Sequence, residues 1–245
     1  MRRIGVVAVG LVIAASVGFA LRGRASVHSR VTVYAAASLT NAFPALAPGE
    51  LYSFGGSNDL AAQVEQGAPA DVFASANMTL PEELHAKGLC SKPVVFTRNE
   101  LVVIVPKANP ARIGRIRALT RPHVRIVIAA AGVPVGDYTL AVLDKLHLAA
   151  EVLKNVVSRE SDVRGVLSKV ALGEADAGFV YATDAQTALG RLQEIEVPAR
   201  AESEVQYAIC VVSGSSRQAA ARAFVEHVLS PAGQRTLRRY GFLRK

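Results

Sequence analysis

The sequence predicts an α/β protein in which parallel sheets are covered by helices on both faces. Two observations support this class. Hydrophobic residues make up 51% of the 245 positions against 20% charged, and beyond residue 30 short apolar runs alternate with stretches of helical periodicity. Such alternation is typical of parallel sheets buried on both faces. The length suits one large domain or two lobes of ordinary size, and the composition excludes disordered, collagen-like and small disulfide-scaffold classes.

The N-terminal segment, residues 1–25, has the features of a signal peptide or an N-terminal anchor. Two arginines precede an apolar run at 4–21, which is the pattern of an n-region followed by an h-region. Cleavage after Ala20 or Ala25 satisfies the small-residue rule, whereas an uncleaved anchor stays open because the run just reaches spanning length. We therefore expect an exported protein of the periplasm or cell envelope. We do not expect a lipoprotein, because no cysteine lies near the end of this segment.

The expected strands, in chain order, are six short runs rich in apolar residues. They are Val31–Ala37, Asp71–Ala76, Leu101–Pro106, Val124–Ala130, Ala177–Tyr181 and Val205–Val212. Five other stretches have helical patterns, and they are Asn58–Gln66, Pro81–Lys87, Tyr138–Leu146, Val163–Ala171 and Ala219–Leu229. No repeat of 20–50 residues is visible, which argues against a solenoid.

Five strand-to-helix junctions carry hydroxyl or carboxylate side chains. They lie at Ser38, Ser57, 135–137, 161–162 and 181–184. A helix start leaves backbone N–H groups without partners and carries a partial positive charge. In parallel α/β sheets such starts gather at the carboxyl ends of the strands, where ligands bind. Helix capping explains any single junction, but five together, with no cation or catalytic group between them, favour an anion-binding site.

Enzyme and nucleic-acid functions find little support in the sequence. It contains no G-x-S-x-G, H-E-x-x-H, P-loop or G-x-G-x-x-G motif, and its five histidines lack metal-ligand spacing. Tryptophan is absent and aromatics are only 6%, which argues against a stacking surface for single strands. The arginine-rich stretch 108–121 is better interpreted as a solvated helix face. We expect no catalytic residue, no metal ligand and no nucleic-acid partner.

The sequence contains two cysteines, Cys90 and Cys210. Export places them where a disulfide can persist, but two buried thiols acting as small hydrophobes would also fit. The sequence leaves both alternatives open.

Several segments, in consistent order over about residues 31–245, resemble the molybdate-binding periplasmic proteins. A-A-A-S-L-T-N-A at 35–42 resembles the family's first ligand loop, and F-G-G-S-N-D-L-A at 54–61 resembles its second serine loop. The run G-A-P-A-D-V-F-A-S-A at 67–76 is similar to a family hallmark. The remaining matches are D-V-R-G at 162–165, G-F-V-Y at 178–181 and R-Y-G-F at 239–242.

The resemblance implies a type II periplasmic-binding-protein fold, in which two α/β lobes joined by a hinge of two crossing strands close on a ligand in the cleft. Lobe I would comprise 31–105 plus 207–245, and lobe II would comprise 106–206. The implied function is the extracytoplasmic receptor of an ABC importer for molybdate, usually tungstate too. The implied partners are a permease and an ATPase subunit, with no cofactor and a monomeric receptor.

By their positions in these motifs, the resemblance implies five ligand-binding residues in this sequence. They are Ser38, Ser57, Val135, Val163 and Tyr181. Val135 stands where the family often has alanine. The segment 43–53, with two prolines, is shorter than the family pattern, which puts the length of the edge strand in doubt.

Two alternatives remain within this fold. One is a receptor for sulfate or another tetrahedral oxyanion, because sulfate and molybdate accept the same type of hydrogen bond. The other is the effector domain of a transcription regulator, against which the export segment and the lack of an N-terminal helix-turn-helix both count.

Overall fold

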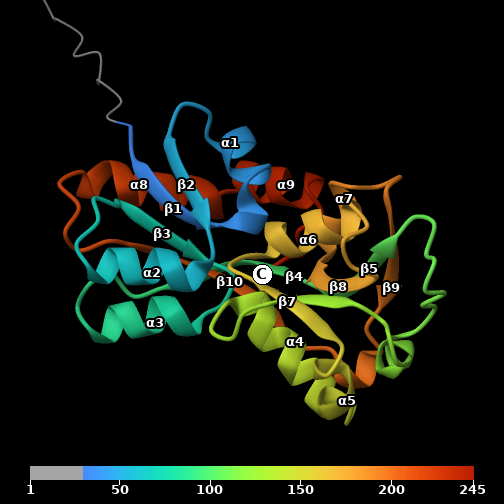
Figure 1. Ribbon diagram of the computed structural model, residues 1–245. Coiled ribbons are helices and arrows are strands. Elements are labelled where there is room, and N and C mark those ends of the chain that lie inside the picture. The colour runs from blue at the N-terminus through green and yellow to red at the C-terminus, as the bar shows by residue number, and fades with distance from the viewer. Residues whose placement is uncertain (1–29) are drawn as a thin grey trace, which may run out of the picture.

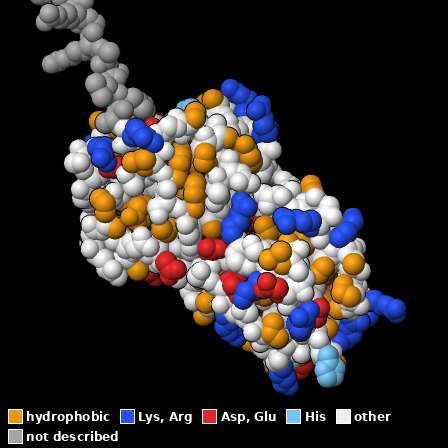
Figure 2. Space-filling view, turned by 45° about the horizontal axis from the view of Figure 1, so that its top comes forward, with side chains coloured by type: hydrophobic (Ala, Val, Ile, Leu, Met, Phe, Trp, Pro, Cys, Tyr) orange, Lys and Arg blue, Asp and Glu red, His pale blue; other side chains and the backbone are white. Residues whose placement is uncertain are grey.

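The computed structural model describes residues 30–245 as two α/β lobes, each built around a five-stranded sheet (Figure 1). The predicted signal or anchor segment lies outside the described residues. The sheet of lobe I has the strand order β2-β1-β3-β10-β4, and that of lobe II has the order β7-β6-β8-β5-β9. In the space-filling view the two lobes meet at a narrower waist (Figure 2).

The elements have the following bounds. The strands of lobe I are β2 (Leu51–Gly55), β1 (Thr32–Ala36), β3 (Val72–Ser75), β10 (Val205–Val211) and β4 (Val94–Asn99). The strands of lobe II are β7 (Val156–Glu160), β6 (Ile126–Ala129), β8 (Ala177–Tyr181), β5 (Leu101–Pro106) and β9 (Leu192–Glu196). The helices of lobe I are η1 (Ala37–Leu39), α1 (Ala42–Leu46), α2 (Ser57–Glu65), α3 (Thr79–Ala86), α8 (Gln218–Leu229) and α9 (Pro231–Arg239). Those of lobe II and the return connection are η2 (Ile116–Thr120), α4 (Pro134–Lys145), α5 (Ala149–Leu153), α6 (Val163–Ala171), α7 (Ala182–Gln186) and η3 (Ala199–Ala201).

In lobe I, β1 lies between β2 and β3 and runs parallel to both. The register pairs Ala36 with Gly55, so these two strands end side by side. Helices α2 and α3 cover one face of the sheet, while α1, α8 and α9 lie over the other (Figure 1). The shortened segment before β2 still leaves a five-residue edge strand that pairs with β1 along its whole length.

Lobe II repeats this plan, because β6 lies between β7 and β8 and is parallel to both. Helices α4 and α6 pack against β6 and β8. The buried residues of α6 are Val163, Val166, Leu167 and Val170. Their spacing of three and four residues forms the single apolar stripe of a helix that rests on a sheet.

The chain crosses between the lobes twice, and the structure corrects the predicted boundaries. Strand β4 ends in the first sheet and β5 begins in the second, so the first crossing is at Glu100 rather than after residue 105. The chain returns before Val205, which already belongs to the first sheet, rather than after residue 206. An apolar run predicts a strand but does not indicate which sheet it joins, and for this reason the sequence placed β5 in the wrong lobe.

The sheets are mixed rather than wholly parallel as predicted. β10 is antiparallel to β3 and β4, and β5 is antiparallel to β8 and β9. All six predicted strands are present, and they are the interior strands of the two sheets. The four strands that no apolar run revealed, β2, β4, β7 and β9, are the edges; of these, only β2 was expected, from the family resemblance. Edge strands mix polar and apolar residues because they are less buried, so they lack the continuous apolar run of an interior strand.

Cys90 and Cys210 lie in a small apolar core beneath α2 and α3. Cys90 Sγ donates to the carbonyl oxygen of Pro81 at 3.5 Å. Both cysteines are buried free thiols, and the two thiol groups are in contact. This contact and burial raise the pKa of Cys210. Of the two alternatives that the sequence left open, the structure has the buried thiols.

None of the helices between residues 30 and 245 has the length and apolar content that a membrane crossing requires.

Candidate functional site

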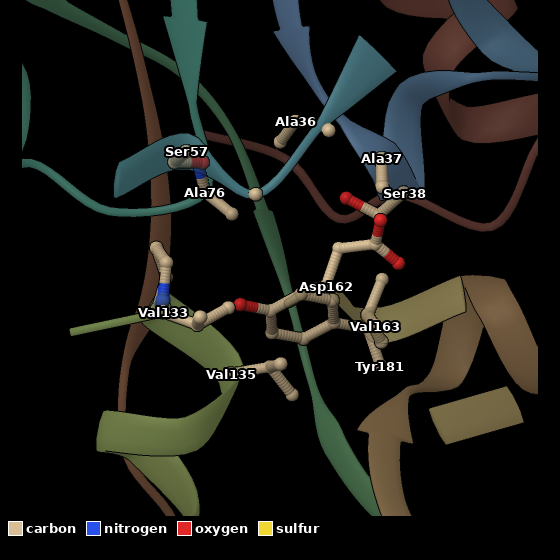
Figure 3. A pocket seen from close by; sticks show the side chains of 13 residues that line it. Ala36, Ala37, Ser38, Ser57, Ala76, Val133, Val135, Asp162, Val163 and Tyr181 are labelled. Atoms are coloured by element: carbon tan, nitrogen blue, oxygen red, sulfur yellow. The ribbon is translucent and has the colours of Figure 1, made fainter. Parts of the chain in front are cut away.

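A cavity of about 210 Å³ lies between the two lobes. All five predicted ligand-binding residues line it, namely Ser38, Ser57, Val135, Val163 and Tyr181. In Figure 3 the Tyr181 ring lies beside Val135 and Val163, and the two serines face it from the other lobe.

The lining comes from the carboxyl ends of six parallel strands, three in each lobe. β1, β2 and β3 lead into 36–38, 55–57 and Ala76, while β6, β7 and β8 lead into 133–135, 162–163 and Tyr181. Three of these connections open helices of at least nine residues, α2, α4 and α6. The unpaired N–H groups and positive ends of these helices therefore converge on one small space.

Each serine hydroxyl of lobe I has one partner inside the protein. The Ala76 N–H donates to Ser57 Oγ at 3.1 Å, and Tyr207 Oη lies 2.8 Å from Ser38 Oγ. Ser57 is the first residue of α2 and does not cap it; the N-cap is Gly56. Because the backbone donor occupies a lone pair of Ser57 Oγ, the proton of this hydroxyl is free for a ligand.

The Tyr181 hydroxyl differs, because it has no hydrogen-bond partner among the described residues although the side chain is only 1% exposed. Burial, together with the neighbouring Tyr207, raises the pKa of Tyr181 well above its ordinary value. The phenol therefore keeps its proton at neutral pH. A buried donor without an acceptor is costly, which indicates that a ligand completes its hydrogen bonding.

Val135 and Val163 can offer only backbone polar atoms to the cavity, because valine side chains carry none. Val163 is the first residue of α6, and Asp162 Oδ1 accepts from the next two N–H groups, of Arg164 and Gly165, at 2.8 and 3.0 Å. Among the described residues the N–H of Val163 has no acceptor, and Val163 lines the cavity. In α4, Pro134 occupies the first turn without an N–H of its own, so Val135 supplies the first free amide.

The two lobes touch at the mouth of the cavity. A Cβ atom placed on Gly56 would lie 2.3 Å from the backbone oxygen of Ser161 in lobe II. Real Cβ atoms do not approach a carbonyl oxygen so closely, so only glycine permits this contact. The cleft is therefore closed in this structure.

Among the described residues that line the cavity there is no lysine or arginine, and Asp162 is the only one with a carboxylate. Behind it, Arg164 Nε lies 3.1 Å from Asp184 Oδ1, joining the starts of α6 and α7. Burial raises the pKa of Asp184 to about 7, although Arg164 acts to lower it. Between residues 30 and 245, no group of three His, Cys, Asp or Glu side chains is placed to hold a metal ion.

Sequence reasoning missed three residues around the site, Gly56, Asn99 and Tyr207. Gly56 lies within the motif at 54–61, but the sequence does not show the contact between the lobes that requires glycine at this position. Tyr207 lies within a predicted strand and is separated from Ser38 by 169 positions. No local pattern signals a hydrogen bond between residues so far apart.

Comparisons with known proteins agree with this geometry. The family described as bacterial extracellular solute-binding protein matches residues 31–243. A molybdate-binding protein of Mycobacterium tuberculosis is 38% identical over 224 residues, covering 86% of this chain and 84% of the relative. One from Escherichia coli is 32% identical over 246 residues, covering 93% and 95%. The solved periplasmic molybdate-binding protein of Azotobacter vinelandii shares the fold, with a TM-score of 0.76, 22% identity and coverage of 88% and 100%.

Proposed function

We propose a molybdate-capturing function from one premise: the chain belongs to the family of bacterial extracellular solute-binding proteins. In this proposal it binds molybdate, and tungstate as a close substitute, and delivers the anion to an ABC importer. The observation that carries the proposal is the closed cavity between the lobes. Its polar groups include three hydroxyls and several helix-start amides, and none of the described residues that line it carries a basic side chain.

Molybdate at neutral pH is a tetrahedral dianion with four acceptor oxygens and no proton. In the proposed complex the hydroxyls of Ser38, Ser57 and Tyr181 donate to these oxygens, and the amides of Val135 and Val163 complete the shell. Hydrogen bonds to an ionised acceptor are roughly twice as strong as neutral ones. The helix starts supply the balancing positive potential, so the site needs no lysine or arginine.

Selectivity in this proposal has two sources. Hydrogen phosphate carries a proton that needs an acceptor. The cavity hydroxyls and amides act as donors, and Oδ1 of Asp162, the one carboxylate among the described lining residues, already accepts from the Arg164 and Gly165 amides, so the site disfavours this anion. Sulfate has the same shape and the same acceptors as molybdate but is smaller, so the closed cavity must select against it by size. Tungstate matches molybdate in shape and charge, and we expect the site to accept both.

We infer that the chain is a binding protein without catalytic activity. Among the described residues that line the cavity there is no histidine, lysine or cysteine that could activate a serine nucleophile. We further infer that it is exported, that it acts as a monomer, and that its partners are a permease and an ATPase subunit. Family membership and the apolar N-terminal run support these inferences.

Isothermal titration calorimetry of the purified protein with molybdate, tungstate, sulfate and phosphate tests the proposal. We expect stoichiometric binding of molybdate and tungstate, and much weaker binding of the other two. Tighter binding of sulfate would reassign the receptor to that anion, and no binding of any of the four would reject the oxyanion function. Fractionation of the source cells separates an exported receptor from a cytoplasmic regulator domain of the same fold.

A further inference from the structure

A second row of buried polar groups lies behind Ser38, outside the cavity. Tyr207, on β10, is completely buried, and its Oη lies 2.8 Å from Ser38 Oγ. Asn99, the last residue of β4, places its Nδ2 3.3 Å from the same phenol oxygen. The side chain of Asn99 is also buried. These three residues form a hydrogen-bond chain that runs from the crossing between the lobes to the anion cavity.

The direction of this hydrogen-bond chain follows from its first member. The Glu100 N–H donates to Asn99 Oδ1 at 2.9 Å, which identifies the amide oxygen and leaves Nδ2 as a donor only. Nδ2 donates to Thr183 Oγ1 at 2.8 Å as well as to Tyr207 Oη. The phenol oxygen of Tyr207 therefore accepts from Asn99.

The proton of Tyr207 must then go to Ser38. Burial raises the pKa of Tyr207 well above its ordinary value, so the phenol is neutral. Ser38 Oγ is its one remaining polar neighbour among the described residues. If Ser38 donated to the phenol instead, the phenol proton would be buried without an acceptor, an arrangement that folded proteins avoid. With Tyr207 donating, Ser38 accepts at the back and keeps its own proton for the cavity.

We propose that Asn99 and Tyr207 are positioning residues that fix Ser38 as a hydrogen-bond donor to the anion and so help to reject protonated oxyanions. This inference rests on the proposed function, because it deepens the role of Ser38 at the same site. Ser57 is fixed in the same sense by the Ala76 N–H. The Ser38 and Ser57 hydroxyls thus each accept one hydrogen bond from another group of the protein.

Tyr207→Phe is the primary variant, because it removes the donor to Ser38 and keeps the ring. The ring packs against Phe96, Tyr181 and Phe242 with centroid distances of 6.1, 5.7 and 5.5 Å. Tyr52→Phe is the matched control, since the Tyr52 hydroxyl donates to backbone oxygens of the same lobe and does not line the cavity. We expect Tyr207→Phe to weaken molybdate binding by about tenfold, the equivalent of one ordinary hydrogen bond, while Tyr52→Phe leaves the affinity unchanged.

A double-mutant cycle with Ser38→Ala distinguishes positioning from a structural role. If Tyr207 acts through Ser38, Tyr207→Phe has no further effect on molybdate affinity once Ser38 is alanine. The ratio of phosphate to molybdate dissociation constants, measured by competition, should also fall in Tyr207→Phe, because the phenol no longer occupies a lone pair of Ser38 Oγ and both lone pairs can then accept. Equal losses in both backgrounds, or an unchanged ratio, would overturn the proposal.

Neutron diffraction of the deuterated, unliganded protein tests the direction without any ligand. We expect the Tyr207 deuteron on the side of Ser38 and the Ser38 deuteron towards the cavity; the reverse arrangement would refute the inference. This measurement also covers the case in which Tyr207→Phe does not fold. If calorimetry shows that sulfate binds in place of molybdate, the proposed function fails. The double-mutant cycle then tests the positioning role of Tyr207 with sulfate as the ligand. If no tetrahedral anion binds, both proposals fall.

Discussion

Tyr181→Phe is the sharpest probe of the proposed site, because it removes one hydroxyl and keeps the ring. Within residues 30–245 that hydroxyl has no hydrogen-bond partner, and the centroid of its ring lies 5.7 Å from that of Tyr207. Removing it breaks no hydrogen bond in the unliganded protein, so the free energy of unfolding should stay within about 1 kcal/mol of the wild type. Any loss of affinity then reports on contact with the anion.

The expected loss of affinity follows from the kind of bond that is removed. A hydrogen bond to a charged group contributes about 1.5–3 kcal/mol. At about 1.4 kcal/mol per factor of ten, this corresponds to a molybdate dissociation constant roughly 10- to 150-fold higher. Calorimetry measures the affinity, and urea denaturation without anion measures the stability.

Ser57→Ala is the comparison variant, because its hydroxyl also accepts from the Ala76 N–H at 3.1 Å. It should lose affinity over the same range and, in addition, leave a buried N–H unpaired at a cost of about 1–3 kcal/mol in unfolding free energy. The proposed contact between the Tyr181 hydroxyl and the anion is refuted if Tyr181→Phe binds molybdate as tightly as the wild type. It is also refuted if Tyr181→Phe loses as much stability as Ser57→Ala.

Three further predictions follow from the lobe contact, the buried carboxylate and the thiols. Gly56→Ala should weaken molybdate binding and hold the cleft more open in small-angle scattering, because the new Cβ would lie 2.3 Å from Ser161 O. Gly114→Ala is the control that should behave as wild type, because its new Cβ would meet no atom within 4 Å and Gly114 does not line the cavity. Asp184 has a folded pKa of about 7 against an ordinary value of 3.8, so its contribution to stability is complete below about pH 4 and is lost as the pH rises to about 7. Across this window the free energy of unfolding of the wild type should fall by up to about 1.4 kcal/mol per pH unit relative to that of Asp184→Asn. If the free energies of unfolding of both proteins change in parallel with pH, the raised pKa of Asp184 is rejected. The unfolded, unreduced protein should label at two thiols per chain, whereas no labelling would indicate a disulfide.

The sequence by itself determined the interior of the fold. The six predicted strands are the six interior strands, and the helix predicted at Val163–Ala171 has the bounds of α6. Interior strands are buried on both faces, so nearly every residue must be apolar and the run is visible in the sequence. The serine and helix-start motifs likewise identified the cavity lining, because the residues at each strand end are local in sequence.

Only the tertiary structure decided how these pieces meet. The four edge strands were not visible as apolar runs because their residues face solvent in part, and the antiparallel direction of β5 and β10 depends on which sheet each strand joins. The contact of Gly56 with Ser161 exists only when the lobes close. The hydrogen bonds that direct Ser38 join Asn99, Tyr207 and Ser38 across long separations in sequence. Hydrogen-bond direction depends on every donor and acceptor around an atom, and those neighbours are assembled by folding.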